Sequence, residues 1–291
     1  MDEPATRPTA ALEPLAGVLV RAVPDRAVDD GLFGPHTHAW RLHRERGLPL
    51  AGVRALMLQA LNPLAMAGVA EHSTWQRDPF GRLAATTGYV LTLTYADTAT
   101  ALAAAAAVRR IHTHVYGVDP VTRMRYSAED PDELLWVHMS LVDSVLHVAR
   151  RYGRPMSESD ADAYVEEMVP FVETLGVPHE RIPTSTAALA EAMASTSPLI
   201  ATPAAHEAMA IVLDPPGLDE DMRELWHDLG RVAVGILPDW ARDLYGWGAT
   251  PPEELEREPV RQLLGVLDIA FESMPGVLEA RRRIDARMRA A

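Results

Sequence analysis

The chain has 291 residues, 48% of them hydrophobic, and a formal net charge of −14 at pH 7, which suits one large globular domain or two smaller ones. It contains no cysteine and no lysine, which excludes disulfides, thiolate-ligated haem, Schiff-base chemistry and a P-loop lysine. The acidic balance disfavours nucleic acid and anionic membrane surfaces, because both partners need a basic footprint.

The N-terminal residues 1–14 are acidic and Pro-rich, unlike the basic and apolar regions of a signal peptide. No apolar run reaches 18 residues, so we expect no membrane span and a cytoplasmic protein. We expect residues 1–33 to form an irregular arm with a short helical piece at 15–23, followed by one domain over 34–291.

The first part of that domain predicts helices at 39–46, 48–67 and 81–94, from apolar residues at helical spacing. Asn62-Pro63 interrupts the second of these, because proline inside a helical pattern kinks or ends it. Residues 90–95 are the best strand candidate, but their context is helical.

An alanine-rich helix is predicted from about 98 to 116, and alanine lets a bulky, flat partner approach a helix backbone closely. Its expected apolar face carries Ala104, Val108, Ile111 and Val115. His112 and His114 flank that face on either side, and periodicity does not choose between them.

Residues 119–132 are predicted to be a loop, and the helix at 133–152 is the most hydrophobic of the chain, which is typical of a central, buried helix. His138 lies on its apolar side. Its polar stripe consists of Ser140, Asp143, Ser144 and His147. Asp143 amid apolar residues indicates a buried pair with an arginine or a solvated stripe.

Ser157 is the expected N-cap of a helix that ends at Gly176, and Ser185 or Thr186 caps another to about 193. The remaining helices are expected at 203–213, 219–236, 238–245, 252–272 and 275–290. Since no segment shows a convincing alternating pattern, the prediction is an all-α domain of about ten helices.

Common catalytic motifs are absent, among them GxGxxG, Walker A, HExxH, GxSxG and paired Glu-x-x-His helices. The eleven histidines form no cluster with metal-ligand spacing, so we expect one or two of them to act singly. Single-histidine ligation is what a porphyrin iron needs, because the macrocycle supplies four nitrogens.

Several phrases, in this order, resemble the catalytic domain shared by rubber oxygenases (latex-clearing proteins) and MpaB-type oxygenases. They are GPHTHAWRL (34–42), LNPLAMAGVAEHSTW (61–75), DPFGRLAATT (78–87), VRRIHTHVYG (108–117), YSAEDPDELLWVHMSLVDS (126–144) and ETLGVP (173–178). The resemblance spans about 34–195. Residues from about 196 lie outside it, and we assign them no function.

The resemblance implies an all-α oxygenase with haem b in a pocket between central helices, acting with dioxygen on a hydrophobic molecule. The arginine and threonine of the family's helix fall on Arg82 and Thr86, and its axial histidine falls on His112. The Trp-Val-His phrase of small bacterial members ends at His138.

The chain also departs from the pattern. Rubber oxygenases carry a lysine before the threonine, where this chain has Ala85, and their catalytic glutamate has no clear match here. Many small relatives have histidine at the position of Asn62. Polymer cleavage is therefore not implied, and a small-molecule oxygenase fits the shorter chain better.

Other roles stay open for each candidate. His112 either ligates the haem iron or is a hydrogen-bonded core histidine, and His138 is either a second pocket residue or a satisfied core histidine. In the oxygenase interpretation, Arg82, Thr86 and His138 are the catalytic candidates that would polarise bound dioxygen. Arg82 either pairs with a haem propionate or forms a salt bridge with an acidic residue such as Asp78 or Asp143. Thr86 either contacts bound oxygen or a propionate, or bonds to the preceding helical turn.

The alternative for the whole chain is a non-catalytic helical protein that binds haem or another hydrophobic ligand. The sequence leaves the oligomeric state open.

Overall fold

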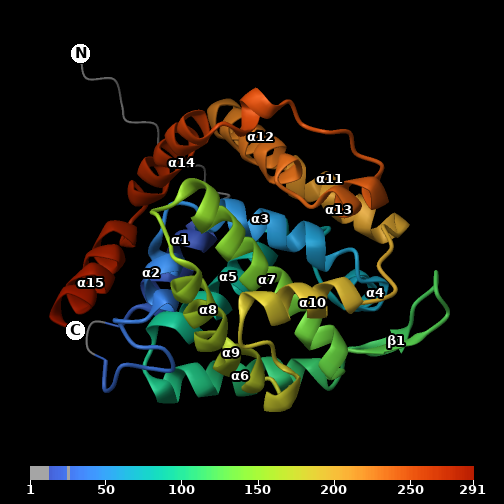
Figure 1. Cartoon of the computed structure of the whole chain (residues 1–291), viewed down its shortest axis with the longest axis horizontal. Helices are drawn as coiled ribbons and strands as arrows, with labels where there is room; N and C mark the ends of the chain where they lie inside the picture. Colours follow the sequence, from blue (N-terminus) through green and yellow to red (C-terminus); the bar gives the residue numbers. More distant parts are fainter. Residues whose placement is uncertain (1–12, 25–26) are drawn as a thin grey trace.

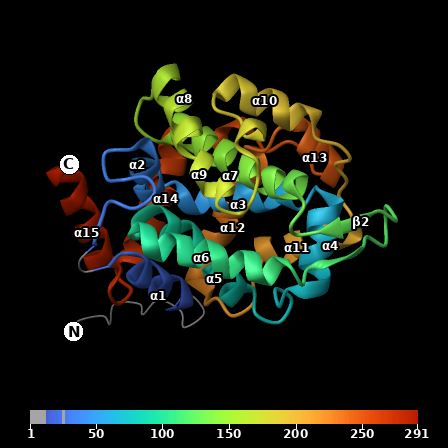
Figure 2. The same ribbon diagram turned by 90° about the horizontal axis from the view of Figure 1, so that it is seen from below.

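A computed structural model describes residues 13–24 and 27–291, and these residues are almost entirely helical (Figures 1 and 2). The all-α prediction is confirmed, although the helices outnumber the ten expected. They are α1 (Glu13–Ala22), α2 (His38–Arg44), α3 (Leu48–Gln59), α4 (Pro63–His72), α5 (Pro79–Tyr95), α6 (Thr98–His112), α7 (Pro131–Tyr152), α8 (Glu158–Glu167), α9 (Val169–Glu173), α10 (Thr186–Ser195), α11 (Pro203–Leu213), α12 (Glu220–Gly235), α13 (Asp239–Tyr245), α14 (Arg257–Glu272) and α15 (Val277–Ala290). Short 3-10 helices η2 (His179–Arg181) and η3 (Pro252–Leu255) complete the helical elements.

Helix α7 is central, as its composition predicts. It packs against α2, α3, α4, α9, α10 and α14, and Trp136 on it is fully buried. The Trp136 indole Nε1 donates a hydrogen bond to the Leu58 carbonyl of α3 at 3.2 Å. Burying so many apolar residues on one helix makes α7 the axis of the core.

Asn62-Pro63 forms the break that the sequence indicates. The Asn62 Oδ1 accepts hydrogen bonds from the Leu64 and Ala65 amides and so caps α4. Helices α3 and α4 meet there at 103°. No single helix in the described part of the chain is long and apolar enough to cross a membrane; only this bent pair passes that test, by length and composition alone.

Helix α6 packs on α5, and α1 covers another side of α5. Ala22 and Val23 from the expected N-terminal arm are buried in the core; residues 1–12 and 25–26 lie outside the described residues. The predicted apolar face of α6 is partly wrong, because Ile111 is 63% exposed. The covered face instead runs through Ala101, Ala105, Val108 and His112.

Residues 113–130 contain a β-hairpin that the sequence analysis missed. Strand β1 (Tyr116–Val118) pairs antiparallel with β2 (Arg125–Ser127), in the register Gly117 opposite Tyr126. The alanine-rich helix therefore ends at His112 rather than at 116, and the expected loop holds a strand. Both views show the hairpin projecting from the body beside α4 (Figures 1 and 2).

The helix expected from Ser157 to Gly176 is divided. Ser157 caps α8 in a reciprocal capping box with Asp160, as predicted. The chain then breaks at Met168, and α9 begins with Pro170 in its first turn, where proline's missing N–H is tolerated. The short α9 places Phe171 against the core.

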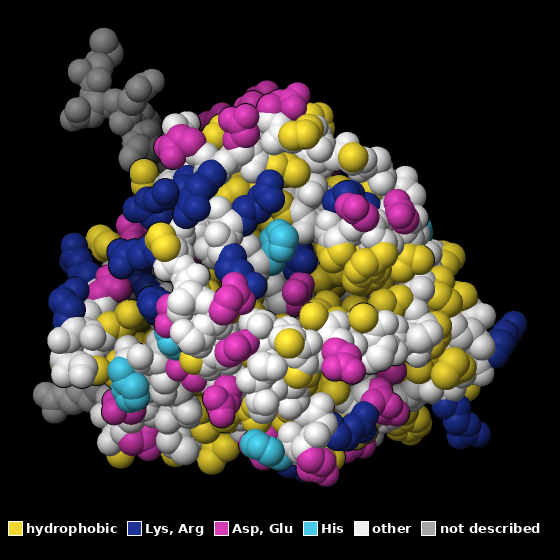
Figure 3. All heavy atoms as spheres, viewed as in Figure 1, with side chains coloured by type: hydrophobic (Ala, Val, Ile, Leu, Met, Phe, Trp, Pro, Cys, Tyr) yellow, Lys and Arg dark blue, Asp and Glu magenta, His cyan; other side chains and the backbone are white. Residues whose placement is uncertain are grey.

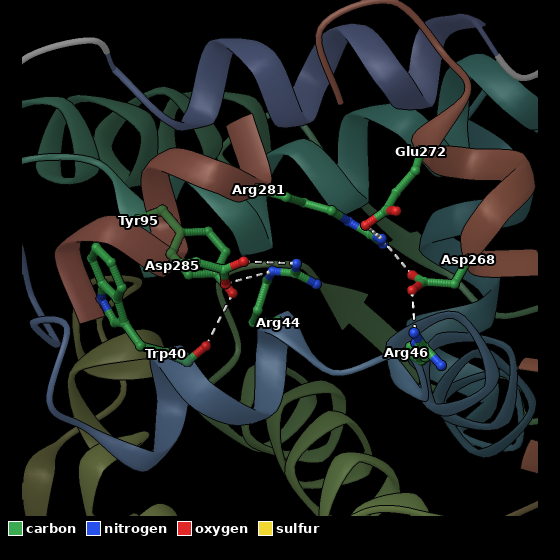
Figure 4. A network of polar contacts seen from close by, with 8 residues as sticks. All are labelled: Trp40, Arg44, Arg46, Tyr95, Asp268, Glu272, Arg281 and Asp285. Atoms are coloured by element: carbon green, nitrogen blue, oxygen red, sulfur yellow. Dashed lines mark hydrogen bonds and ion pairs between the residues drawn. The ribbon is translucent and has the colours of Figure 1, made fainter. Parts of the chain in front are cut away.

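Ion pairs fasten the last two helices to the region around α2 (Figure 4). Arg44 forms a bidentate pair with Asp285 of α15, with both contacts at 3.1 Å. The buried carboxylate of Asp268 on α14 pairs with both Arg46, at 2.9 Å, and Arg281. The C-terminal helices are thus bound to the N-terminal part of the same helical body.

Candidate active site

Helix α5 presents Arg82 and Thr86 one turn apart. Arg82 Nη1 donates to Thr86 Oγ1 at 2.9 Å, and that hydroxyl donates to the Arg82 carbonyl at 3.2 Å. Solvent reaches the Arg82 side chain, yet burial among protein atoms lowers the pKa of its guanidinium.

The salt bridges considered for Arg82 do not form. The Asp78 carboxylate caps α5 through the Gly81 amide at 2.8 Å. Asp143 pairs with Arg54 of α3, whose Nη1 lies 2.7 Å from its Oδ2, so the predicted arginine partner of Asp143 is confirmed. Among the described residues, Arg82 has no ion pair, and its charge is available to an anionic ligand group.

His112 is the last residue of α6, on the helix face that lies against the body. Burial lowers the pKa of its imidazole, and the charge of Arg82 lowers it further, against the opposing effects of Glu129 and the Ala128 backbone. The ring is therefore neutral at physiological pH. A neutral imidazole is the form that ligates a metal.

The structure separates His112 from His114. The His114 side chain is exposed, and its Nδ1 lies 2.9 Å from Thr113 Oγ1 and 3.0 Å from the Arg110 carbonyl. His114 thus bonds to the end of its own helix, whereas His112 is half-buried and within electrostatic reach of Arg82 on α5. Periodicity left the two equivalent because it placed the apolar face of α6 through Ile111.

His138 on α7 is 4% exposed, and its Nδ1 is buried without a hydrogen-bond partner among the described residues. Burial lowers its pKa to about 3, so the ring stays neutral. Its ring centroid lies 5.9 Å from that of Phe171. A buried nitrogen without a partner costs free energy unless a ligand or water satisfies it.

Tyr89 of α5 is a candidate site residue that the sequence analysis missed, and it contacts Phe171 as His138 does. Its ring lies 5.5 Å from Phe171 in edge-to-face geometry, and its buried hydroxyl has no hydrogen-bond partner in the described structure. Burial raises the pKa of this hydroxyl to about 12, and the nearby Thr174 side chain opposes the shift without forming a hydrogen bond within 3.5 Å. The sequence could have indicated Tyr89 as a site residue, because residues 82, 86 and 89 share one helical face at i, i+4 and i+7.

The structure therefore gathers the predicted residues into two groups. Arg82, Thr86 and His112 lie together at the α5–α6 pair, and His138 lies with Tyr89 at Phe171. Because Tyr89 shares its helix face with Arg82 and Thr86, α5 connects the two groups.

Glu133 is a second residue that the sequence analysis left without a role. It lies in the first turn of α7 and is 8% exposed, and its Oε2 is buried without a partner in the described structure. Burial, with a further contribution from Asp130, raises its pKa to about 7, although Ala65 and Asn62 oppose the shift. Its position after the Asp130 cap predicts a surface residue, but the fold turns it toward α4.

The donor set of the first group fits a haem. Among the described residues, no three or more His, Cys, Asp or Glu side chains gather as a metal site, whereas a porphyrin iron needs only one protein ligand. His112 supplies a neutral imidazole, and Arg82 supplies an unpaired guanidinium suited to a propionate. Ala101 and Ala105 keep the inner face of α6 small.

Residues 40–269 match a family model described as "ER-bound oxygenase mpaB/B'/Rubber oxygenase, catalytic domain". The chain belongs to this oxygenase family. No curated protein and no solved structure matches it. The family match confirms the resemblance read from the sequence, and with it the oxygenase class.

The oxygenase domain extends further than the sequence phrases indicate. The quoted phrases resemble the family over about 34–195, whereas the family match reaches residue 269 and so adds α11 to α13 and most of α14. The match contains both groups of site residues.

Ala85, at the position of the rubber-oxygenase lysine, is exposed on α5.

Proposed function

We propose that this chain is a haem b-dependent oxygenase that acts on a hydrophobic small organic molecule with dioxygen. The proposal rests chiefly on one arrangement: half-buried His112 lies within electrostatic reach of Arg82, which has no ion pair among the described residues, inside an oxygenase domain.

In this proposal His112 would hold the haem iron, and dioxygen would be activated at the haem with Arg82, Thr86 and His138 as the candidate donors. Bound haem supplies the redox chemistry that dioxygen activation requires. Arg82 pairs with a propionate, and the Thr86 hydroxyl orients its guanidinium at 2.9 Å. These two residues fix the position of the cofactor rather than transfer protons.

The second group provides polar contacts for substrate or oxygen. His138 and Tyr89 each offer a buried polar atom that has no hydrogen-bond partner among the described residues, and polar groups of this kind orient a bound molecule. We expect the substrate pocket to be lined from the segments 53–70 and 134–146, which are rich in apolar residues. The pocket would favour an aliphatic or unsaturated molecule.

The test is an absorption spectrum of the purified full chain, expressed with a haem precursor, beside His112→Ala and His114→Ala. We expect a Soret band in the parent, its loss or shift in His112→Ala, and no change in His114→Ala. No haem uptake by the parent, or equal effects of the two substitutions, would overturn the assignment.

Turnover of a panel of unsaturated small molecules, measured as dioxygen consumption and product formation, then distinguishes the oxygenase from the alternative, a non-catalytic haem- or ligand-binding protein. A chain that binds haem but converts no substrate in the presence of a reductant would support the alternative.

A further inference from the structure

The end of α6 and the β1–β2 hairpin expose a group of large apolar side chains. This stretch holds five of the thirteen large hydrophobic side chains that are exposed in the described part of the chain: Ile111, Tyr116, Val118, Val121 and Met124. Single exposed apolar side chains are ordinary, but several within fourteen residues mark a surface that contacts another apolar phase.

The hairpin is a well-held structure rather than a loose loop. Tyr126 of β2 is 5% exposed, and its hydroxyl donates to Glu71 Oε2 of α4 at 2.5 Å. At the tip, the Asp119 carboxylate accepts hydrogen bonds from the Thr122 amide and hydroxyl, at 2.7 and 2.6 Å. The apolar side chains are therefore held outward by a defined backbone.

The same surface is basic, in contrast to the chain as a whole. Arg109, Arg110, Arg123 and Arg125 are exposed, and none forms an ion pair with a described residue. The one acidic residue between 109 and 125 is Asp119, which is 2% exposed and occupied in the turn. We call these four arginines and five apolar residues the hairpin patch.

A surface groove of about 550 Å³ adjoins the patch. It is lined by Arg110, Ile111 and His114 of α6 and its end, with His72 of α4 opposite. In the space-filling view, basic side chains stand out at the end of the hairpin with hydrophobic atoms beside them (Figure 3). Apolar and cationic groups thus alternate over one projecting corner of the molecule.

We propose that the hairpin patch docks on the surface of a lipid bilayer that contains anionic lipid. Apolar side chains of the tip would enter the boundary between headgroups and acyl chains, while the arginines contact phosphates and keep their charges in the interface. Tyrosine, here Tyr116, is enriched at that depth in membrane proteins. The patch does not depend on haem, so this proposal stands apart from the proposed function.

The averaged charge of the sequence leads to the opposite expectation, that anionic membranes are disfavoured. Net charge does not describe the field at one part of the surface, because exposed charges more than about 10 Å apart are largely screened from each other at 0.1 M salt. Because the hairpin projects, its arginines can contact the bilayer surface while most of the acidic side chains of the protein remain further from that surface. For an oxygenase of hydrophobic molecules, such docking would place the enzyme where its substrate partitions.

The first test is flotation of the purified full chain with vesicles of phosphatidylcholine alone or with phosphatidylglycerol added. We expect binding that needs phosphatidylglycerol and weakens with salt. The variant Arg123→Asn with Arg125→Gln should bind about 25-fold more weakly, about fivefold for each arginine. Asparagine suits position 123, where the backbone φ is 63°.

The matched control replaces two exposed arginines of α15, Arg282→Gln with Arg289→Gln, and changes the net charge by the same amount. It should bind like the parent. No binding of the parent to phosphatidylglycerol vesicles, or equal weakening in both variants, would overturn the proposal. So would light scattering that shows a dimer disrupted by the hairpin variant alone, because a second copy would then cover the patch.

The absence of cysteine allows a direct measure of insertion. Val121→Cys, labelled with an environment-sensitive fluorophore, should brighten and shift to the blue when phosphatidylglycerol vesicles are added. Leu278→Cys on α15, 40% exposed in the parent, should not respond. Equal responses at the two positions would contradict docking through the hairpin.

Discussion

Arg82 reaches both partners of the candidate site: its Nη1 lies 2.9 Å from Thr86 Oγ1 on its own helix, and its charge acts on His112 of the neighbouring helix. Burial and this charge both lower the pKa of His112. The two helices thus favour the neutral imidazole before any ligand binds. A metal ion that binds the ring therefore does not have to displace a proton from it.

Replacing Arg82 with Gln should raise the pKa of His112 toward its ordinary value of 6.5, because the repulsion between the two cations disappears. Proton NMR of the haem-free protein across a pH series would follow the His112 ring signals. Arg109→Gln, on the exposed side of α6, is the control and should leave that titration unchanged. An identical titration in Arg82→Gln and the parent would show that the two side chains are not coupled.

Tyr89→Phe should leave stability unchanged or raise it slightly, by at most about 1 kcal/mol, because the Tyr89 hydroxyl makes no hydrogen bond within 3.5 Å to any described residue. Tyr95→Phe on the same helix is the comparison, since the Tyr95 hydroxyl donates to the Trp40 carbonyl at 3.1 Å. That variant should lose about 1 kcal/mol in urea unfolding. If Tyr89 contacts the ligand, the Tyr89→Phe variant should remain folded but show reduced turnover. If it instead loses as much stability as Tyr95→Phe, the Tyr89 hydroxyl has a structural role.

Because of Glu133, the free energy of unfolding should fall as pH rises. Its pKa in the folded chain is about 7, above its ordinary 4.5, so the folded state holds the proton more tightly. The resulting stabilisation is complete below pH 4.5 and is lost as pH rises through about 7. Between about pH 5 and pH 8, the parent should lose about 2 kcal/mol relative to Glu133→Gln.

Urea unfolding of the parent, Glu133→Gln and the exposed-site control Glu129→Gln at both pH values measures this difference. Glu129→Gln should follow the parent at each pH. A constant difference between the parent and Glu133→Gln would show that Glu133 ionises normally.

Asp268→Asn should destabilise the chain by about 2 kcal/mol, because it leaves Arg46 and Arg281 without the buried carboxylate they share. Arg281 retains Glu272 at 2.8 Å, so the loss stays partial. Thermal unfolding beside Asp243→Asn, an exposed carboxylate on α13, provides the comparison. Equal melting temperatures for the two variants would mean that the network in Figure 4 contributes little.

Much of the fold is predictable because helix ends carry local chemistry. Ser157 caps α8, Pro203 begins α11 and Asn62-Pro63 divides α3 from α4, each through contacts within a few residues. The hairpin lacked such a signal. Its strands have three residues each, too few to show an alternating pattern, and it depends on Tyr126 packing against α4.

The candidate site divides in the same way. The order of phrases along the chain was enough to identify the oxygenase family and to select Arg82, Thr86, His112 and His138. The sequence phrases did not identify Tyr89 or Glu133, because these residues matter only through their burial in the folded chain. Both carry a buried oxygen without a partner in the described structure, and only the packing of α4, α5, α7 and α9 buries these atoms.

The sequence by itself determined the helical class, most helix boundaries and the family, because these follow from periodicity, capping and the order of short motifs. Only the tertiary structure gave a physical difference between His112 and His114, through their burial. It alone also paired Asp143 with Arg54 and gathered four arginines beside exposed apolar side chains in an acidic chain. The reason is physical: burial and electrostatic interaction depend on distances in space, and residues far apart in sequence set those distances.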